Sequence, residues 1–178
     1  ITKNSENRGL MTQAVWDSIR PYLPEIKSID FTGGGEPLLQ PKLPEWIAEA
    51  NARGCETGFL SNGLLLKKDK LQKILDAGVN WICISMDGAD AEMYEKIRVG
   101  SNFKRVCENL GNIAKLRSGN RPKTMINFVL MDLNFHQVED IVQLAAELGV
   151  DQINFKQCDV IRGESGKGHG LFEPEETK

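Results

Sequence analysis

Three consecutive glycines, Gly33 to Gly35, are followed by Glu36 and Pro37 and come just after the short run Ile29 to Phe31, which is apolar apart from Asp30. Glycine lacks a Cβ atom, so it permits backbone angles and close approaches that other residues forbid. An ordinary connection between two elements does not need such a run. We therefore expect a loop that follows a strand and lies against a ligand.

The rest of the chain repeats one structural unit, an amphipathic helix that ends at a glycine and is followed by a short apolar strand. The segment 135–148 shows this most clearly, because Asn134 precedes its apolar face and Gly149 follows it. The predicted helices cover 12–22, 43–53, 68–77, 103–117 and 135–148, and the predicted strands cover 28–31, 57–60, 80–86, 124–131 and 152–158. This alternation predicts an α/β fold with a parallel sheet, either a full or partial barrel or an open sheet.

Polar residues cluster just after the predicted strands, where parallel sheets of this class bind their ligands. Besides the glycine loop, they are Ser61, Asn62, Gly63, Ser85, Asp87, Gly88, Asp132, Asn134, Cys158 and Asp159. Glu36 and the loop carbonyls can accept hydrogen bonds from a cation, while Ser85 and Arg98 can donate to an anion. Together these groups suit a ligand with both an ammonium and a carboxylate. Taken alone, Ser61-Asn62-Gly63 and Asp87-Gly88 are more often turns.

Composition favours a globular protein with one main domain. The chain has 178 residues, a hydrophobic fraction of 40% and a net charge of -3, without the basic excess of a nucleic-acid-binding surface. No apolar stretch reaches the roughly 20 residues that span a bilayer, and the first residues do not resemble a signal peptide. We expect a cytoplasmic protein with no membrane partner, a core domain over 1–160, and a flexible linker or the start of a following region over 161–178.

The four cysteines, Cys55, Cys83, Cys107 and Cys158, form no CxxC pair and have no histidine close to them in sequence. We therefore expect no metal site encoded within this sequence. A reduced cysteine in an apolar stretch usually acts as a small core residue, and unpaired thiols fit a reducing compartment. No sequence pattern identifies a catalytic residue.

Several motifs in order resemble those of the radical S-adenosylmethionine (SAM) enzymes. The family's Gly-Gly-Glu-Pro corresponds to Gly34 to Pro37, its Thr/Ser-Asn-Gly to Ser61 to Gly63, and its Ser-x-Asp-Gly to Ser85 to Gly88. A Tyr/His-x-x-Ile-Arg segment follows at Tyr94 to Arg98, and a helix opening with Phe-x-x-Val follows at Phe103 to Val106. The chain resembles most the subgroup that contains molybdenum-cofactor cyclases and peptide-modifying maturases.

The resemblance implies a partial, TIM-like barrel of parallel strands, of which this chain would hold strands two to six of the family's six and lack the first. In this family, a loop after the first strand carries Cys-x-x-x-Cys-x-x-Cys, which is absent from this sequence and which we expect upstream of Ile1. Its thiolates hold a four-iron four-sulfur cluster that chelates the amino and carboxylate groups of SAM. An electron donor reduces the cluster, and cleavage of SAM gives a 5′-deoxyadenosyl radical that abstracts hydrogen from a substrate.

Position by position, the resemblance assigns cofactor contacts to Gly34, Gly35, Glu36, Pro37, Asn62, Ser85, Arg98, Asn127 and Asn134. The glycines and Glu36 would hold the methionine ammonium, and Pro37 would fix the exit of the loop. Ser85 and Arg98 would bind the methionine carboxylate or the ribose side. For Arg98 the alternative is a solvated arginine at a helix end.

The remaining assignments have structural alternatives. Asn127 would face the ribose, whereas Asn134 would either face the ribose or cap a helix. Asn62 would contact the cofactor or shape a turn, and Asp87 most often serves the turn.

The sequence does not identify the substrate, because family members that share this loop act on peptides, nucleotides and small metabolites. An alternative to the enzyme is a non-catalytic binding or scaffold module on the same barrel, if the parent chain lacks the cysteines. Without a first strand, the segment 28–31 would form a bare sheet edge, so we also expect self-association through that edge.

Overall fold

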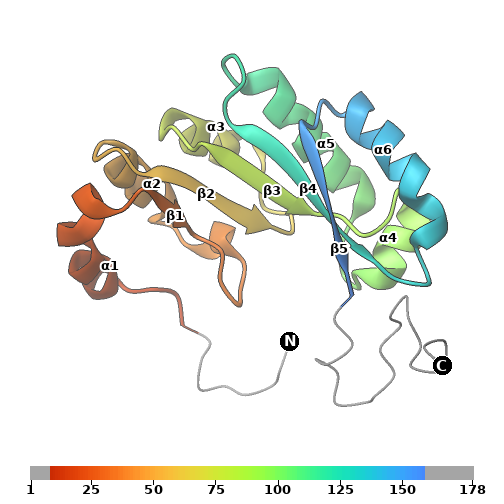
Figure 1. Ribbon diagram of the computed structural model, residues 1–178, viewed down its shortest axis with the longest axis horizontal. Coiled ribbons are helices and arrows are strands. Elements are labelled where there is room, and N and C mark those ends of the chain that lie inside the picture. The colour runs from red at the N-terminus through yellow and green to blue at the C-terminus, as the bar shows by residue number, and fades with distance from the viewer. Residues whose placement is uncertain (1–8, 159–178) are drawn as a thin grey trace, which may run out of the picture.

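The computed structural model describes residues 9–158, which fold into a five-stranded parallel sheet with helices against one face (Figure 1). The strands are β1 (Ser28–Asp30), β2 (Glu56–Ser61), β3 (Trp81–Ser85), β4 (Lys123–Leu130) and β5 (Gln152–Gln157), and they lie in chain order across the sheet. The predicted α/β fold is confirmed, and the sheet is open. The expected linker over 161–178 lies outside the described residues.

The predicted helices are present, although several begin or end with a tighter 3₁₀ turn. They are α1 (Gln13–Ile19) with η2 (Arg20–Glu25), α2 (Leu43–Asn51), α3 (Lys68–Asp76), α5 (Phe103–Leu116), and η4 (Phe135–Gln137) with α6 (Val138–Glu147). The structure adds η3 (Pro37–Leu39) and α4 (Ala91–Ile97), which the sequence pattern did not predict. Helix α4 is short and buries only Tyr94, so it carries no clear apolar stripe.

Glycines end several helices as predicted. Gly54, Gly78 and Gly149 have φ angles of 86°, 81° and 71°, a left-handed conformation that glycine adopts without a Cβ penalty. Pro44 stands in the first turn of α2, also as predicted. Each helix therefore stops just before the chain turns back into the next strand.

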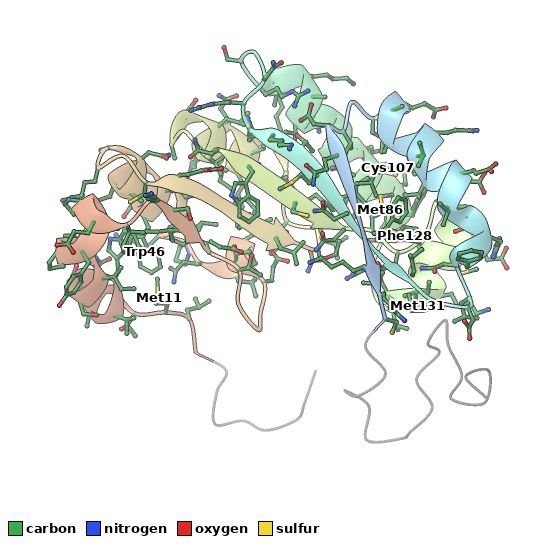
Figure 2. All side chains as sticks on the ribbon, in the orientation of Figure 1. Met11, Trp46, Met86, Cys107, Phe128 and Met131 are labelled. Atoms are coloured by element: carbon green, nitrogen blue, oxygen red, sulfur yellow. The ribbon has the colours of Figure 1, made fainter. Side chains whose placement is uncertain are left out.

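A continuous apolar core lies between the sheet and the helices. It includes Phe59, Ile82, Ile84, Ile126 and Phe128 from the strands and Leu71, Ile74, Val106, Leu110 and Ile113 from α3 and α5. Met86 and Phe128 lie in this layer, as Figure 2 shows. Burial of each large apolar side chain stabilises the fold by about 1.5–3 kcal/mol. This layer fixes the strands and hence the loops that follow them.

A second, smaller cluster packs α1 against α2 near the β1 edge. Trp16 stacks on Trp46 with ring centroids 5.3 Å apart, and both side chains are buried. Cys55 joins this cluster and its thiol donates to the carbonyls of Leu23 and Ile26. Trp16, Trp46 and Cys55 therefore belong to the core of this part of the molecule.

No described helix covers the opposite side of the sheet, which we call the open face. Strand alternation places Leu60, Trp81, Cys83, Ser85, Met125, Asn127, Asn154 and Lys156 on it. Trp81 lies on this face, where its ring covers the backbone of Gly58. A Cβ atom added at Gly58 would stand 2.1 Å from that ring.

Strand β1 pairs with β2 alone among the described residues. The self-association expected from this edge stays a prediction. None of the described helices has the length and apolar character needed to cross a bilayer.

Candidate functional site

The glycine loop Gly33 to Gly35 follows β1 and has no internal need for glycine. None of these residues has a positive φ angle, and a Cβ atom added to any of them would meet no described atom within 4 Å. Gly63 and Gly88 differ, since Gly63 has φ 75° and Gly88 would place a Cβ 2.5 Å from the Tyr94 nitrogen. The loop thus leaves open space beside its backbone, where a ligand can approach closely.

Glu36 holds this loop against the end of β2. Its Oε1 accepts from the Ser61 hydroxyl at 2.8 Å and from the Leu38 nitrogen at 3.0 Å, and its Oε2 accepts from the Asn62 nitrogen at 2.9 Å. A carboxylate offers about four acceptor positions, so Glu36 keeps capacity for a further donor. Pro37 begins η3 directly after it, which confirms its place at the loop exit.

Thr32 adds a second connection between the loop and β2. Its hydroxyl donates to the Asp30 carboxylate and accepts from the Leu60 nitrogen at 2.9 Å. The Thr32 side chain therefore continues the pairing of β1 with β2 beyond Asp30, the last residue of β1, and fixes the start of the loop.

Asn62 shapes the turn after β2, which was one of the two roles expected for it. Its Oδ1 accepts from the Leu64 nitrogen at 2.9 Å, the usual contact of an asparagine turn. Ser61 was predicted only as one of the polar residues after this strand. In the structure it is buried, and its hydroxyl donates to Glu36 and accepts from the Gly63 nitrogen.

Arg98 pairs with Asp87 at 2.6 Å after β3. The Asp87 carboxylate is buried and also accepts from the Val129 nitrogen at 2.8 Å. Arg98 is therefore not a freely solvated arginine at a helix end, because the Asp87 carboxylate pairs with its Nη2, whereas its buried Nε has no hydrogen-bond partner among the described residues. Asp87 likewise does more than shape a turn, since it ties α4 and β4 to the end of β3.

The structure corrects the assignment of Asn134. Its side chain is completely buried, its Oδ1 accepts from the Met131 nitrogen at 2.8 Å, and its Nδ2 donates to the carbonyls of Val129 and Asp87 at 2.8 and 3.0 Å. It also makes no side-chain cap to η4. Asn134 thus joins the loops after β3 and β4 and leaves no donor for a ribose.

Ser85, Asn127 and Asn154 form one row across the open face. Ser85 pairs in register with Asn127, and Asn127 pairs with Asn154. The Asn154 amide donates to Asn127 Oδ1 at 3.1 Å. Ser85 and Asn127, both predicted from the sequence, are therefore neighbours, and Asn154 extends their row. Asn154 was not predicted as a site residue, although its position between apolar Ile153 and Phe155 places it on the opposite face of the strand from them.

The cysteines are dispersed, and the described residues contain no group of three side chains that would hold a metal ion. Cys83 lies on the open face, where burial raises the pKa of its thiol to about 11. Burial likewise raises the pKa of Cys107, on α5, to about 11. The described side chains thus provide no ligand set for an iron-sulfur cluster.

A hollow of about 580 Å³ lies at the other end of the strands and is lined by Asn51, Gly54, Cys55, Glu56, Gly78, Asn80, Asn120, Arg121 and Lys123. None of the predicted site residues lines it. The predicted residues instead lie toward the carboxyl ends of β1 to β4 or in the segments that follow these strands (Figure 1).

Comparison with known families agrees with this arrangement. The family model described as the radical SAM superfamily matches residues 13–145. The chain belongs to this superfamily. The resemblance of the strand-end motifs is thereby confirmed, because the match includes β1 to β4 and the loops after them.

Two curated relatives in this superfamily have different named activities. A "Probable GTP 3',8-cyclase" of Methanococcus aeolicus is 33% identical over 156 residues, which cover 83% of this chain and 49% of the relative. A "PqqA peptide cyclase" of Bradyrhizobium diazoefficiens is 26% identical over 145 residues, which cover 80% of this chain and 37% of the relative. The chain thus spans half or less of the length of these relatives.

Among solved structures, Streptococcus suis SuiB bound to its precursor peptide SuiA superposes with a TM-score of 0.71 at 17% identity. The superposition covers 86% of this chain and 34% of SuiB. SuiB therefore has the same α/β fold over the superposed residues.

Proposed function

We propose that this chain is the core of a radical SAM enzyme and binds SAM at the carboxyl edge of its sheet. The observation that carries the proposal is the open space beside Gly33 to Gly35, whose glycines are required neither by φ angle nor by internal packing. An amino-acid ammonium can approach backbone carbonyls there without meeting a Cβ atom.

Glu36 would take part in this site in two ways. It fixes the loop through the contacts with Ser61, Leu38 and Asn62, and its remaining acceptor position suits the methionine ammonium. Because three donors of this chain bond to the Glu36 carboxylate, its orientation would be fixed before SAM binds.

Ser85 and Asn127 would contact the carboxylate or ribose of SAM from the open face. Ser85 is the last residue of β3, and Asn127 lies beside it on β4. Asn127 accepts from Asn154 through Oδ1, so its amide hydrogens remain for a ligand oxygen. Arg98 acts in this proposal by holding Asp87, and Asn62 by shaping the turn.

In the full-length protein, cysteines outside this sequence would hold the iron-sulfur cluster, which would supply the electron for cleavage of SAM, and the residues described here would hold SAM in place. The cluster belongs to the full-length protein in this proposal, as does the electron donor that reduces it. We place the enzyme in a reducing, cytoplasmic compartment, since its cysteines form no disulfide.

The substrate would be a peptide or a nucleotide, the two classes named for the relatives that act as a peptide cyclase and a GTP cyclase. The open face offers donors to either class, including Lys156, which forms no ion pair within residues 9–158. An ammonium at this position suits a carboxylate or a phosphate of the substrate.

The test uses the full-length protein after anaerobic reconstitution of iron and sulfide. SAM binding is measured by equilibrium dialysis, and SAM cleavage is measured as 5′-deoxyadenosine formed with dithionite. We expect both. Binding without cleavage would favour the non-catalytic module, and the absence of both would overturn the proposal.

A further inference from the structure

A chain of hydrogen bonds leads from the middle of α5 to the glycine loop. It begins at Asn109, which is only 6% exposed and lies in the apolar stripe formed by Val106, Leu110 and Ile113. The Asn109 Nδ2 donates to the Gly63 carbonyl at 2.7 Å. A buried polar side chain among apolar residues costs stability unless it forms a hydrogen bond, and Asn109 forms this bond with the backbone next to β2.

Gly63 links Asn109 to the end of β2, because its carbonyl bonds to Asn109 and its nitrogen bonds to Ser61. Its nitrogen donates to the Ser61 hydroxyl at 3.0 Å. Its φ angle is 75°, and an added Cβ atom would stand 3.1 Å from Ile84 and 3.2 Å from Val106. The peptide groups on both sides of Gly63 are therefore confined by core packing as well as by Asn109.

Ser61 completes the connection to the loop by donating to Glu36 Oε1 at 2.8 Å. A carboxylate can only accept, and a hydroxyl has one hydrogen to donate, so the direction of this bond is fixed. The Ser61 oxygen accepts from Gly63 while its hydrogen is given to Glu36, an order in which successive hydrogen bonds strengthen one another.

We propose that Asn109 and Ser61 are positioning residues, which orient Glu36 and thereby hold the glycine loop in the conformation that binds SAM. This inference rests on the proposed function. Neither residue touches the open space beside the loop; both act through Glu36. Helix α5, on the far side of the sheet from the open face, would thus help to set cofactor affinity.

Asn51 provides a matched control. Its Nδ2 also donates to backbone carbonyls, those of Ala77 and Gly78, at 2.9 and 2.8 Å. It lies at the end of α2 and lines the hollow at the amino ends of the strands, away from the glycine loop. Asn51→Ala therefore removes the same kind of bond without reaching Glu36.

The experiment compares Asn109→Ala, Ser61→Ala and Asn51→Ala in the full-length, cluster-reconstituted protein. SAM affinity is measured by equilibrium dialysis, amide hydrogen exchange is followed for residues 32–38, and Tm reports folding. We expect Asn109→Ala and Ser61→Ala to raise the Kd for SAM about tenfold, the effect of losing roughly one net hydrogen bond. Exchange in residues 32–38 should rise in both. Asn51→Ala should lower Tm yet leave the Kd and this exchange unchanged.

An equal loss of SAM affinity in Asn51→Ala would overturn the inference, since general destabilisation would then explain the result. Unchanged exchange over residues 32–38 in both test variants would also overturn it. If Asn109→Ala does not fold, Ser61→Ala still decides, because it removes only a hydroxyl. A wild-type protein that binds no SAM would instead refute the proposed function, which separates the two failures.

Discussion

Arg98, at the end of α4, pairs with Asp87, which follows β3, and their charged groups are 2.6 Å apart. Asp87 is 5% exposed at its side chain and Arg98 is 28% exposed, so the pair is neither fully buried nor freely solvated. The pair holds the end of α4 against the segment that follows β3 at the carboxyl edge of the sheet. The arginine in the Tyr-x-x-Ile-Arg segment therefore has a partner within the chain.

Removal of either partner should destabilise the protein, and the two losses should not add. We expect Asp87→Asn and Arg98→Gln each to cost about 2 kcal/mol, between the values for exposed and fully buried pairs. Urea unfolding of both single variants and the double variant gives the coupling energy. Purely additive losses would show that Arg98 stabilises the protein independently of Asp87.

Gly34→Ala should weaken SAM binding while leaving the fold intact. The added Cβ meets no described atom, and the φ angle of Gly34 is not in the left-handed region. Stability should be unchanged or rise by about 0.4–1 kcal/mol, because alanine restricts the unfolded chain. Thermal unfolding and equilibrium dialysis of the full-length protein measure the two effects separately.

Gly58→Ala serves as the contrast for that experiment, since its Cβ would collide with the Trp81 ring. It should lower Tm strongly through overpacking, at a cost of about 1–3 kcal/mol. A Gly34→Ala protein that binds SAM as tightly as the wild type would contradict the role of the open space.

Asn134→Ala should be among the more damaging single changes at this edge of the sheet. It leaves the Met131 nitrogen, the Val129 carbonyl and the Asp87 carbonyl without their side-chain partner, and the first two are half-buried. An unsatisfied buried group costs about 1–3 kcal/mol, so we expect a loss of about 3 kcal/mol in urea unfolding. A loss of SAM affinity at unchanged stability would restore Asn134 as a ligand contact.

The Asp151 carboxylate should make stability depend on pH in the acid range. A hydrogen bond from Arg117, followed by one from the Thr124 nitrogen, lowers its pKa below the usual 3.8. A lowered folded pKa contributes stability that is present above the unfolded pKa and is lost as pH falls through the folded pKa. Asp151→Asn should cost about 1–2 kcal/mol at pH 7, and this difference should shrink below pH 3.8. Unfolding of both proteins between pH 2 and 7 measures it, and a difference independent of pH would contradict the assignment.

Cys83 should react slowly with iodoacetamide although it lies on the open face. Its pKa of about 11 leaves about one thiol in a thousand ionised at pH 8, and the thiolate is the nucleophile. In a variant with the other cysteines changed to serine, the labelling rate should rise nearly tenfold per pH unit up to about pH 10. Rapid labelling at pH 8 would show that burial does not keep the Cys83 thiol protonated at that pH.

The sequence allowed most of the fold to be predicted, because long helices such as α5 carry a clear apolar stripe and end at recognisable positions. Helix α4 was missed since its only buried residue is Tyr94, although Asp90 caps its start by accepting from the Met93 nitrogen. A single buried residue provides no period to detect.

The sequence indicated candidate site residues but not their contacts. The end of the first predicted strand indicated Glu36 and the Tyr-x-x-Ile-Arg motif indicated Arg98, whereas their partners depend on three-dimensional packing. Ser61 lies 25 positions from Glu36, and Asn134 reaches Asp87 across 47 positions. Asn109 was visible as a polar residue among apolar neighbours, and only the fold reveals that it bonds to Gly63.

Trp81 begins β3, and Ser85 ends it. Four steps along a parallel strand correspond to about 13 Å, and Cys83, which is only 3% exposed, lies between these two residues on the same face. The Trp81 ring occupies the space beside Gly58, where any Cβ atom would collide with it. The amino half of β3 is thus closed by an indole ring, and only its carboxyl end is left to a polar side chain.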